Sequence, residues 1–360
     1  MKNLLFLQLI LFASVYGCQS TRVKNSSLTS SDRSPEIQVL NLSGQNSRPK
    51  FSPDGAHILY ISAERDRHKQ RQAYIYNLST QTDRRLTFQD GEVTEILSLI
   101  TNSNNRIEST LVYASTTDEI KERPEFIKKF LNQNKTGDTS IDAQFSLEYK
   151  NLLGEIEAST EIYSSTLSGR NIDRITNSPG FDGSLRPLGK ENKIAFASRS
   201  VEKPIYKMFN LASRQQKSLT DLPVDAEFLA WSKSENHMSW SSPSKSAGNS
   251  SDLWMRDLKN KNSLLLISGP GHHVDSTWVD EDSIVFSSNR SDSTTYQIFM
   301  IQKDGTCLRQ LTTSATSKRH PDLSPDGKQL IFTLMEDNKS QIGLMDFSPP
   351  PCPEGPGPIQ

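Results

Sequence analysis

The chain contains one phrase twice: Phe51-Ser52-Pro53-Asp54-Gly55 and Leu323-Ser324-Pro325-Asp326-Gly327. In each copy, proline fixes φ at the second turn position, aspartate can bond its own backbone, and glycine accepts the positive φ that closes a hairpin. A short apolar run follows both copies, Ile58–Ile61 and Gln329–Phe332. The phrase therefore predicts a tight turn between two β-strands.

The same unit recurs in weaker form elsewhere in the chain. Degenerate copies of the turn precede β-rich runs at Arg186–Lys190, Trp231–Glu235 and Trp278–Asp282. An aromatic, alternating strand comes next in each unit, as in Tyr74-Ile75-Tyr76. A Leu-Thr or Ile-Thr pair then closes four of the units: Leu86-Thr87, Ile175-Thr176, Leu219-Thr220 and Leu311-Thr312.

These closing pairs are spaced almost evenly. Leu311 lies 92 residues after Leu219, which makes two periods of 46, and Leu219 lies 44 residues after Ile175. Four strands repeated at this spacing are typical of a propeller blade. Residues 35–347 hold an insertion near 116–160, and the 268 residues that remain without it suffice for six blades of about 45.

The two ends of the repeat region predict how the ring closes. Glu36–Leu40 looks like an outermost strand without a blade of its own, and the last unit ends after Ile342–Met345. We expect the first strand to complete the last blade, because pairing removes an open edge. The fold class expected is all-β: a six-bladed β-propeller of four-stranded blades, closed by its N-terminal strand, with a helical insertion in blade two.

The turn, the aromatic third strand and the Leu-Thr fourth strand resemble the repeat of TolB-type six-bladed propellers, which are WD40-like. Ser178–Asp182, after Ile175-Thr176, is also similar to that family's junction between blades. The resemblance covers roughly residues 35–347. It implies a periplasmic setting and contacts with other envelope proteins, such as peptidoglycan-associated lipoproteins. The family's namesake has an additional N-terminal α/β domain, which residues 1–34 are too short to form.

The first residues predict a signal for export from the cytoplasm. Lys2 precedes the apolar run Leu4–Phe12, which is typical of a secretory signal. Val15-Tyr16-Gly17-Cys18 then resembles a bacterial lipobox, which implies a signal peptide over 1–17 and an acylated Cys18. An ordinary signal peptide with an incidental cysteine is the alternative. Gln19 after the cysteine favours the outer membrane, facing the periplasm, over the inner membrane.

The segments around the propeller are polar or proline-rich. Residues 18–34 cannot bury enough surface to offset their ordering entropy, so we expect a flexible tether. Residues 348–360 are too rich in proline to join a sheet. Within the insertion, Thr117–Leu131 predicts a short amphipathic helix that Asp118 could cap. Such a helix could act as a functional lid or simply cover apolar surface.

Composition excludes several classes of function. The chain has 41 Lys and Arg against 42 Asp and Glu, a net charge of −1, which predicts no nucleic-acid partner. It contains no GxSxG, HExxH or P-loop motif and no cysteine-histidine cluster. We therefore expect no cofactor, no metal and no enzyme activity of these types, and we expect a monomeric propeller.

One set of polar residues stands just before the inner strand of each blade, where the chain crosses to the channel mouth. It consists of Arg48, Asp182, Asp225, His272, His273, Arg319 and His320. Such residues could bind a polar ligand or a peptide, or hold a metal. They could equally be solvated junction residues.

Two further cysteines stand at matching places in adjacent units. Cys307 follows the turn after the third strand of blade five, and Cys352 lies just beyond the corresponding strand of blade six. In an exported protein these positions predict a disulfide.

The function expected is that of a lipid-anchored envelope protein whose propeller binds or scaffolds protein or peptide partners. The alternative is an enzyme or sensor for a small anionic or sugar-derived ligand at the channel mouth.

Overall fold

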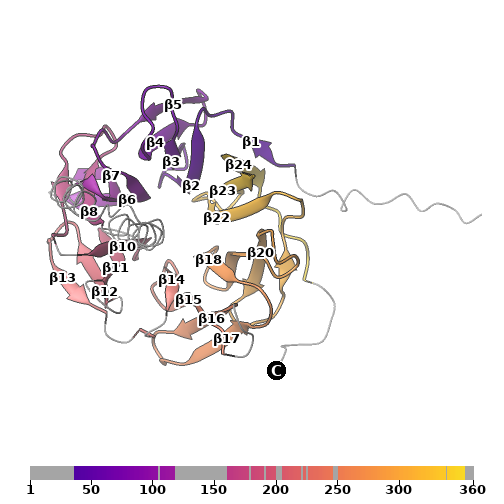
Figure 1. Ribbon diagram of the computed structural model, residues 1–360. Helices are drawn as coiled ribbons and strands as arrows, with labels where there is room; N and C mark the ends of the chain where they lie inside the picture. Colours follow the sequence, from indigo (N-terminus) through magenta and orange to yellow (C-terminus); the bar gives the residue numbers. More distant parts are fainter. Residues whose placement is uncertain are drawn as a thin grey trace, which may run out of the picture. The chain divides into compact units, whose positions relative to one another are not determined.

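The fold comes from a computed structural model, which describes residues 36–103, 106–117, 160–177, 180–189, 192–199, 205–219, 222–223, 226–245, 250–337 and 339–352. All of them belong to one compact unit, Pro35–Gln360. They form six four-stranded antiparallel sheets around a common axis (Figure 1). The expected six-bladed, all-β architecture is therefore confirmed. The helix expected after Thr117 lies outside the described residues. Among those residues, no helix is long and apolar enough to cross a membrane.

The first three blades follow one another along the chain, each running from an inner strand to an outer one. Blade one is β2 (Gln45–Phe51), β3 (His57–Ala63), β4 (Gln72–Asn77) and β5 (Thr82–Arg85). Blade two is β6 (Val93–Ser103), β7 (Arg106–Ser115), β8 (Glu161–Thr166) and β9 (Asp173–Arg174). Blade three is β10 (Phe181–Pro187), β11 (Lys193–Arg199), β12 (Ile205–Asn210) and β13 (Gln216–Ser218).

The next two blades repeat this order, and the last one differs. Blade four is β14 (Glu227–Trp231), β15 (His237–Pro243), β16 (Ser251–Asp257) and β17 (Ser263–Ile267). Blade five is β18 (His273–Trp278), β19 (Ser283–Ser288), β20 (Gln297–Gln302) and β21 (Arg309–Gln310). Blade six takes β22 (Ser317–Leu323), β23 (Gln329–Glu336) and β24 (Lys339–Asp346) from the end of the chain.

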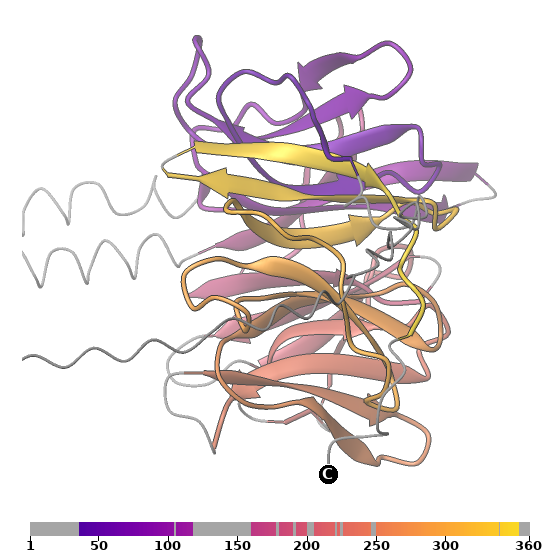
Figure 2. The same cartoon turned by 90° about the vertical axis from the view of Figure 1, so that its right-hand side faces the viewer.

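The N-terminal strand completes blade six. β1 (Gln38–Val39) pairs with β24 through Gln38 opposite Leu344 and Val39 opposite Gly343. Figure 1 shows the indigo start of the propeller beside its yellow end. In the side view, the yellow strands of blade six lie against the indigo strands of blade one (Figure 2). The expected closure by the first strand is thus confirmed.

The apolar core is divided among the seams between blades. Each of six buried clusters takes its side chains from two adjacent blades, including the seam between blades six and one. The second strand of a blade is covered on both faces, so β3 and β19 are buried almost throughout and each has a continuous apolar run, Ile58–Ile61 and Ile284–Phe286. Burial between sheets explains why these strands show continuous rather than alternating apolar residues.

Hydrogen bonds of the serine hydroxyl explain why the turn motif contains serine and aspartate. In the first copy, the Ser52 hydroxyl donates to Asp54 and accepts from the His57 amide at 3.0 Å. In the second, Ser324 donates to Asp326 and accepts from the Gln329 amide at 2.9 Å. The turn glycines of the two copies have φ values of 70° and 71°, in the region that glycine tolerates best.

The closing threonine has an equally specific role. The Thr87 hydroxyl accepts from the Ala73 amide at 2.9 Å and donates to the Gln72 side chain at 2.8 Å. Thr312 bonds Ile298 and Gln297 in the same way, at 2.9 and 3.0 Å. The pair therefore ties the outer strand to the start of the third strand, while its leucine enters the seam between blades.

Candidate binding site in the propeller channel

Each inner strand is interrupted by a bulge where it passes the axis. The register shifts in all six innermost pairs. In five of them the bulge holds a non-glycine residue with φ between 50° and 56°: Arg48, Ser184, Phe228, Asp275 and His320. A bulge bends its strand and re-aims the side chains around it. In each of these five strands, it lies four residues before the turn residue that corresponds to Ser52, called here the serine position: Ser52, Leu188, Ser232, Val279 and Ser324.

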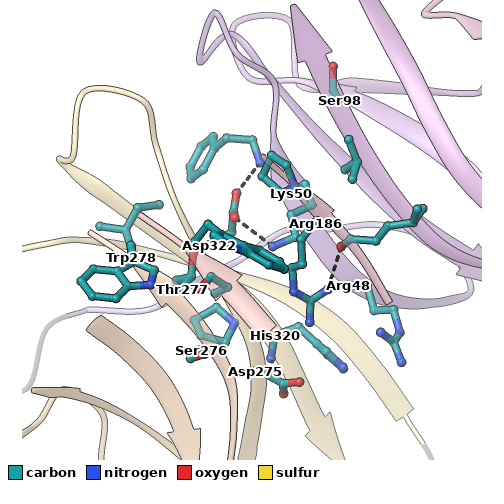
Figure 3. A pocket seen from close by; sticks show the side chains of 18 of the residues that line it. Arg48, Lys50, Ser98, Arg186, Asp275, Ser276, Thr277, Trp278, His320 and Asp322 are labelled. Atoms are coloured by element: carbon teal, nitrogen blue, oxygen red, sulfur yellow. Dashed lines mark hydrogen bonds and ion pairs between the residues drawn. The ribbon is translucent and has the colours of Figure 1, made fainter. Parts of the chain in front are cut away.

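The inner strands surround a cavity of about 240 Å³. All six contribute to its lining, which extends from the bulges to just beyond the ends of β14, β18 and β22. Figure 3 shows Arg48, Arg186 and His320 in this cavity, with Lys50 paired to Asp322. The cavity therefore lies on the propeller axis, toward the Ser-Pro-Asp-Gly turns.

Three carboxylates of the lining reach across to the next blade. Glu95 of blade two accepts from the Ser184 and Leu185 amides of blade three, both at 2.8 Å. Asp322 of blade six accepts from the Phe51 amide of blade one at 2.9 Å. These amides lie in or beside bulges, where the regular ladder leaves donors unpaired. The carboxylates therefore fasten adjacent blades together.

Asp275 makes the most buried of these links. It accepts from the Arg319 Nε at 2.6 Å and from the His320 amide at 3.2 Å. Burial alone would raise the pKa of the Asp275 carboxyl, but neighbouring basic groups, including Arg319 and Arg48, hold it well below its ordinary value. Burial also lowers the pKa of His320 to about 3. At neutral pH the site therefore has an ionised Asp275 and an uncharged His320.

Four cations also line the cavity: Arg48, Lys50, Arg186 and Lys233. Lys50 forms an ion pair with Asp322 at 2.9 Å. Arg186 donates to the carbonyls of Leu185 and Leu229, which are uncharged acceptors. In the part of the chain that the structure describes, the Arg48 side chain has no hydrogen bond or ion pair. The lining thus carries positive charge that its own carboxylates do not pair.

A second pocket, of about 520 Å³, lies among blades four, five and six. Serines of β15 and β16 line it together with His272, Tyr296 and Arg319. The Arg319 guanidinium stands 4.6 Å from the centre of the Tyr296 ring, while its Nε bonds Asp275. Arg319 therefore lies between this pocket and the cavity on the axis.

The structure separates the seven residues expected at the channel mouth. Arg48 and His320 line the cavity on the axis, whereas His272 and Arg319 line the second pocket. Asp182 is 1% exposed, within the start of blade three.

His273 and Asp225 complete the set. His273 is fully buried and bonds the Ser288 hydroxyl at 2.8 Å, and burial lowers its pKa to about 4. Asp225 lies outside the described residues, as does Cys18. In the regions that the structure describes, no three His, Cys, Asp or Glu side chains are grouped to hold a metal.

Cys307 and Cys352 are joined by a disulfide, with their Cα atoms 5.1 Å apart. The Arg309 guanidinium also donates to the Pro350 carbonyl at 2.7 Å. Both contacts hold the segment after β24 against blade five. They therefore bridge the seam between blades five and six.

Sequence reasoning missed the residues within the inner strands. Lys50, Arg186 and Asp322 line the cavity, and each lies two residues before the serine position of its turn. Asp275 lies four residues before that position. Their constant sequence distance from the turn could have identified them, since a repeat places equivalent residues at equivalent depths in the channel.

Comparisons with known proteins agree with this architecture. Residues 187–350 match the family described as the TolB beta propeller domain. No curated protein sequence matches the chain significantly. TolB from Acinetobacter baumannii has a TM-score of 0.52 at 14% identity, and the match covers 85% of this chain but only 64% of that one.

Two further solved structures extend the comparison. A TolB-like protein from Agrobacterium tumefaciens has a TM-score of 0.54 at 11% identity, covering 87% of this chain and 97% of that one. Oligogalacturonate lyase from Vibrio parahaemolyticus has a TM-score of 0.50 at 13% identity, covering 88% and 94%. Identities this low indicate a shared fold and leave function open. Residues 187–350 therefore match the TolB beta propeller domain, and the chain as a whole is a six-bladed propeller similar in fold to the TolB structures.

Proposed function

We propose that this protein is a cell-envelope binding protein whose propeller holds a protein or peptide partner at its central channel. The observation that carries the proposal is the cavity of about 240 Å³ on the axis, to which all six inner strands contribute. A space of this size fits one side chain or one chain end rather than a folded domain. The partner would therefore insert a short element and rest on the surrounding turns.

The setting belongs to the same proposal. A lipid on Cys18 would anchor the chain to the outer membrane, facing the periplasm, with residues 18–34 as the tether. The pattern Val15-Tyr16-Gly17-Cys18 supports the anchor. The disulfide between Cys307 and Cys352 suits an oxidising compartment. The TolB-type fold supports a protein partner, because related propellers contact other envelope proteins.

The test is chemical cross-linking of the full chain in its own membranes, followed by capture and identification of the attached proteins. The channel variant is Arg48→Gln, because the Arg48 side chain is exposed and its loss leaves the blades intact. The matched control is Arg170→Gln, which removes the same charge from an exposed turn between β8 and β9.

A partner that is lost in Arg48→Gln and kept in Arg170→Gln would support a channel-binding module. A partner kept by both variants would count against the channel as its binding site, and variants in the insertion over 116–160 would be tested next. If the wild-type chain captures no protein at all, the protein-binding proposal is wrong.

A second candidate is a sensor or enzyme for a small anionic ligand. Arg48 and Arg186, which form no ion pair within the described residues, favour it, because they would attract an anion small enough to enter the cavity alone. The fold shared with oligogalacturonate lyase is compatible with this candidate. Turnover or saturable binding of a small acid, in a chain that captures no protein, would favour it over the first proposal.

A further inference from the structure

We infer that the cavity on the axis is a carboxylate-binding site in which Arg48 and Arg186 receive the acidic group of the ligand. The inference rests on the proposed function, because it names the chemistry of the group that enters the channel. The carboxylate could belong to an acidic side chain, to a peptide C-terminus or to a free small acid. These sources share one chemistry, and the experiment below separates them.

The carboxylates of the lining already have partners. Glu95, Asp275 and Asp322 are each engaged by donors of the next blade. Their bonds fasten the blades. Arg48 is near enough to lower the pKa of Asp275, but within the described residues none of the three carboxylates forms a hydrogen bond or ion pair with Arg48 or Arg186. Asp322 balances Lys50, and Asp275 balances Arg319, which lines the other pocket.

Arg48 is the first of the two arginines that would receive the ligand. Its side chain is exposed, lines the cavity, and has no polar partner among the described residues. The backbone around it is held firmly, since the Arg48 amide donates to the Thr333 hydroxyl at 2.9 Å and φ is 52°. A fixed backbone with an unpaired guanidinium presents a cation to the channel.

Arg186 is the second of these arginines. Its Nε and Nη1 donate to the carbonyls of Leu229 and Leu185, at 2.5 and 2.7 Å. A guanidinium has five N–H donors, so these two bonds leave its Nη2 group available within the described region. The acceptors are uncharged, and the arginine keeps its full positive charge. Two carbonyls thus orient the group, while its remaining donors can bind a ligand.

The charge of the lining favours a singly charged anion. Four cations and three carboxylates line the cavity, so the lining carries about one excess positive charge, which a single carboxylate balances and a doubly charged phosphate exceeds. His320 is uncharged and adds no further attraction. A carboxylate can also bind a guanidinium through two parallel hydrogen bonds. The site therefore favours a carboxylate over phosphate.

The experiment is a titration of the purified full chain at low ionic strength, monitored by tryptophan fluorescence. Trp231 and Trp278 line the cavity, so occupancy should change their emission. Four probes are compared: an Asp tripeptide with both ends capped, a neutral tripeptide with a free C-terminus, succinate, and inorganic phosphate. The capped Asn tripeptide is the uncharged counterpart of the first probe.

We expect at least one carboxylate probe to bind saturably, and the probe that binds identifies the source. Arg48→Gln should weaken its binding about tenfold or more, since a bond to a charged group is lost. Arg48→Lys should keep part of the affinity that Arg48→Gln loses, because lysine keeps the positive charge but lacks the paired N–H donors of a guanidinium. Arg170→Gln should bind like the wild type. Thermal melting curves confirm that each variant is folded, and Arg186→Lys tests the second arginine without removing its charge.

Binding of the Asn tripeptide as tight as that of the best carboxylate probe, unchanged binding of that probe in Arg48→Gln, or a preference for phosphate would overturn the carboxylate assignment. So would the absence of saturable binding by every carboxylate probe. A protein partner that still depends on Arg48 would then leave the proposed function standing. Conversely, succinate binding without any captured partner would support the carboxylate site and refute the protein-binding function.

Discussion

Replacing Asp275 with asparagine should destabilise the propeller more than any exposed change. Asp275 is 7% exposed, and its carboxylate accepts hydrogen bonds from Arg319 and from the His320 amide across the seam between blades five and six. Asparagine keeps the shape but removes the charge. Arg319 would then remain half-buried in the seam without its counter-ion.

The size of the effect follows from the contacts that are lost. Breaking a buried ion pair by removing one partner costs about 3–5 kcal/mol. The amide oxygen of asparagine can still accept the two hydrogen bonds, but they lose the charged acceptor that makes such bonds worth about 1.5–3 kcal/mol each. We therefore expect the free energy of unfolding of Asp275→Asn to fall by about 3–5 kcal/mol at pH 7.

The assay is equilibrium unfolding in urea, followed by tryptophan fluorescence. Asp66→Asn is the control, since Asp66 is an exposed loop residue. The effect should also depend on pH. The folded-state pKa of Asp275 is depressed, so its stabilising contribution is present above the unfolded pKa of about 3.9 and is lost as pH falls below it. The gap between the wild type and Asp275→Asn should therefore narrow between about pH 4 and pH 2.

A loss below about 1 kcal/mol at pH 7, which is the range of a surface ion pair, would refute the argument. A gap that stays constant as the pH falls through this window would refute it as well. Either result would mean that Asp275 does not fasten the seam through its charge.

Three other changes test separate features. Replacing Cys307 and Cys352 with serine should lower the free energy of unfolding by about 4 kcal/mol, for a bridge across 45 residues, and reductant should have no further effect on that variant. Glu95→Ala should cost about 2–4 kcal/mol in urea unfolding, because the Ser184 and Leu185 amides lose their acceptor; a neutral result would contradict the link between blades. Burial lowers the pKa of Lys318 to about 8, whereas the lysine of the unfolded chain keeps its proton up to about pH 10.5. The wild type should therefore gain stability relative to Lys318→Met as the pH rises from 8 toward 10.5. Thermal melting curves across this interval test the prediction, and a stability difference that does not change with pH would contradict it.

The repeat could be predicted from the sequence because its motifs are local. Ser52, Asp54 and Gly55 act within one turn, and the hydrogen bonds of Ser52 close on residues a few positions away. Thr87 likewise bonds residues of the neighbouring strand at a fixed offset. Such contacts need no knowledge of distant blades, so the fold and its closing strand followed from the pattern alone.

The site could be predicted only in part, because it depends on the bulges. Arg48 and His320 have positive φ without being glycine, and nothing in their side chains marks such a conformation. One shifted residue decides whether a polar group points into the channel or into a blade. Asp182 and His273 were expected at the mouth from the same reasoning as Arg48, yet both are buried in their blades. The partners of Asp275 could not be predicted from the sequence either, since they lie 44 and 45 residues further along the chain.

The way the ring closes has a consequence during synthesis. β1 leaves the ribosome first, but Gln38 pairs with Leu344, which is made about 300 residues later. At about 5–20 residues per second, the first strand waits roughly 15–60 s for its partner. An unpaired strand edge in a crowded cell invites association with other chains. β1 has only two residues in its ladder, Gln38 and Val39, so it offers little edge to a wrong partner during that delay.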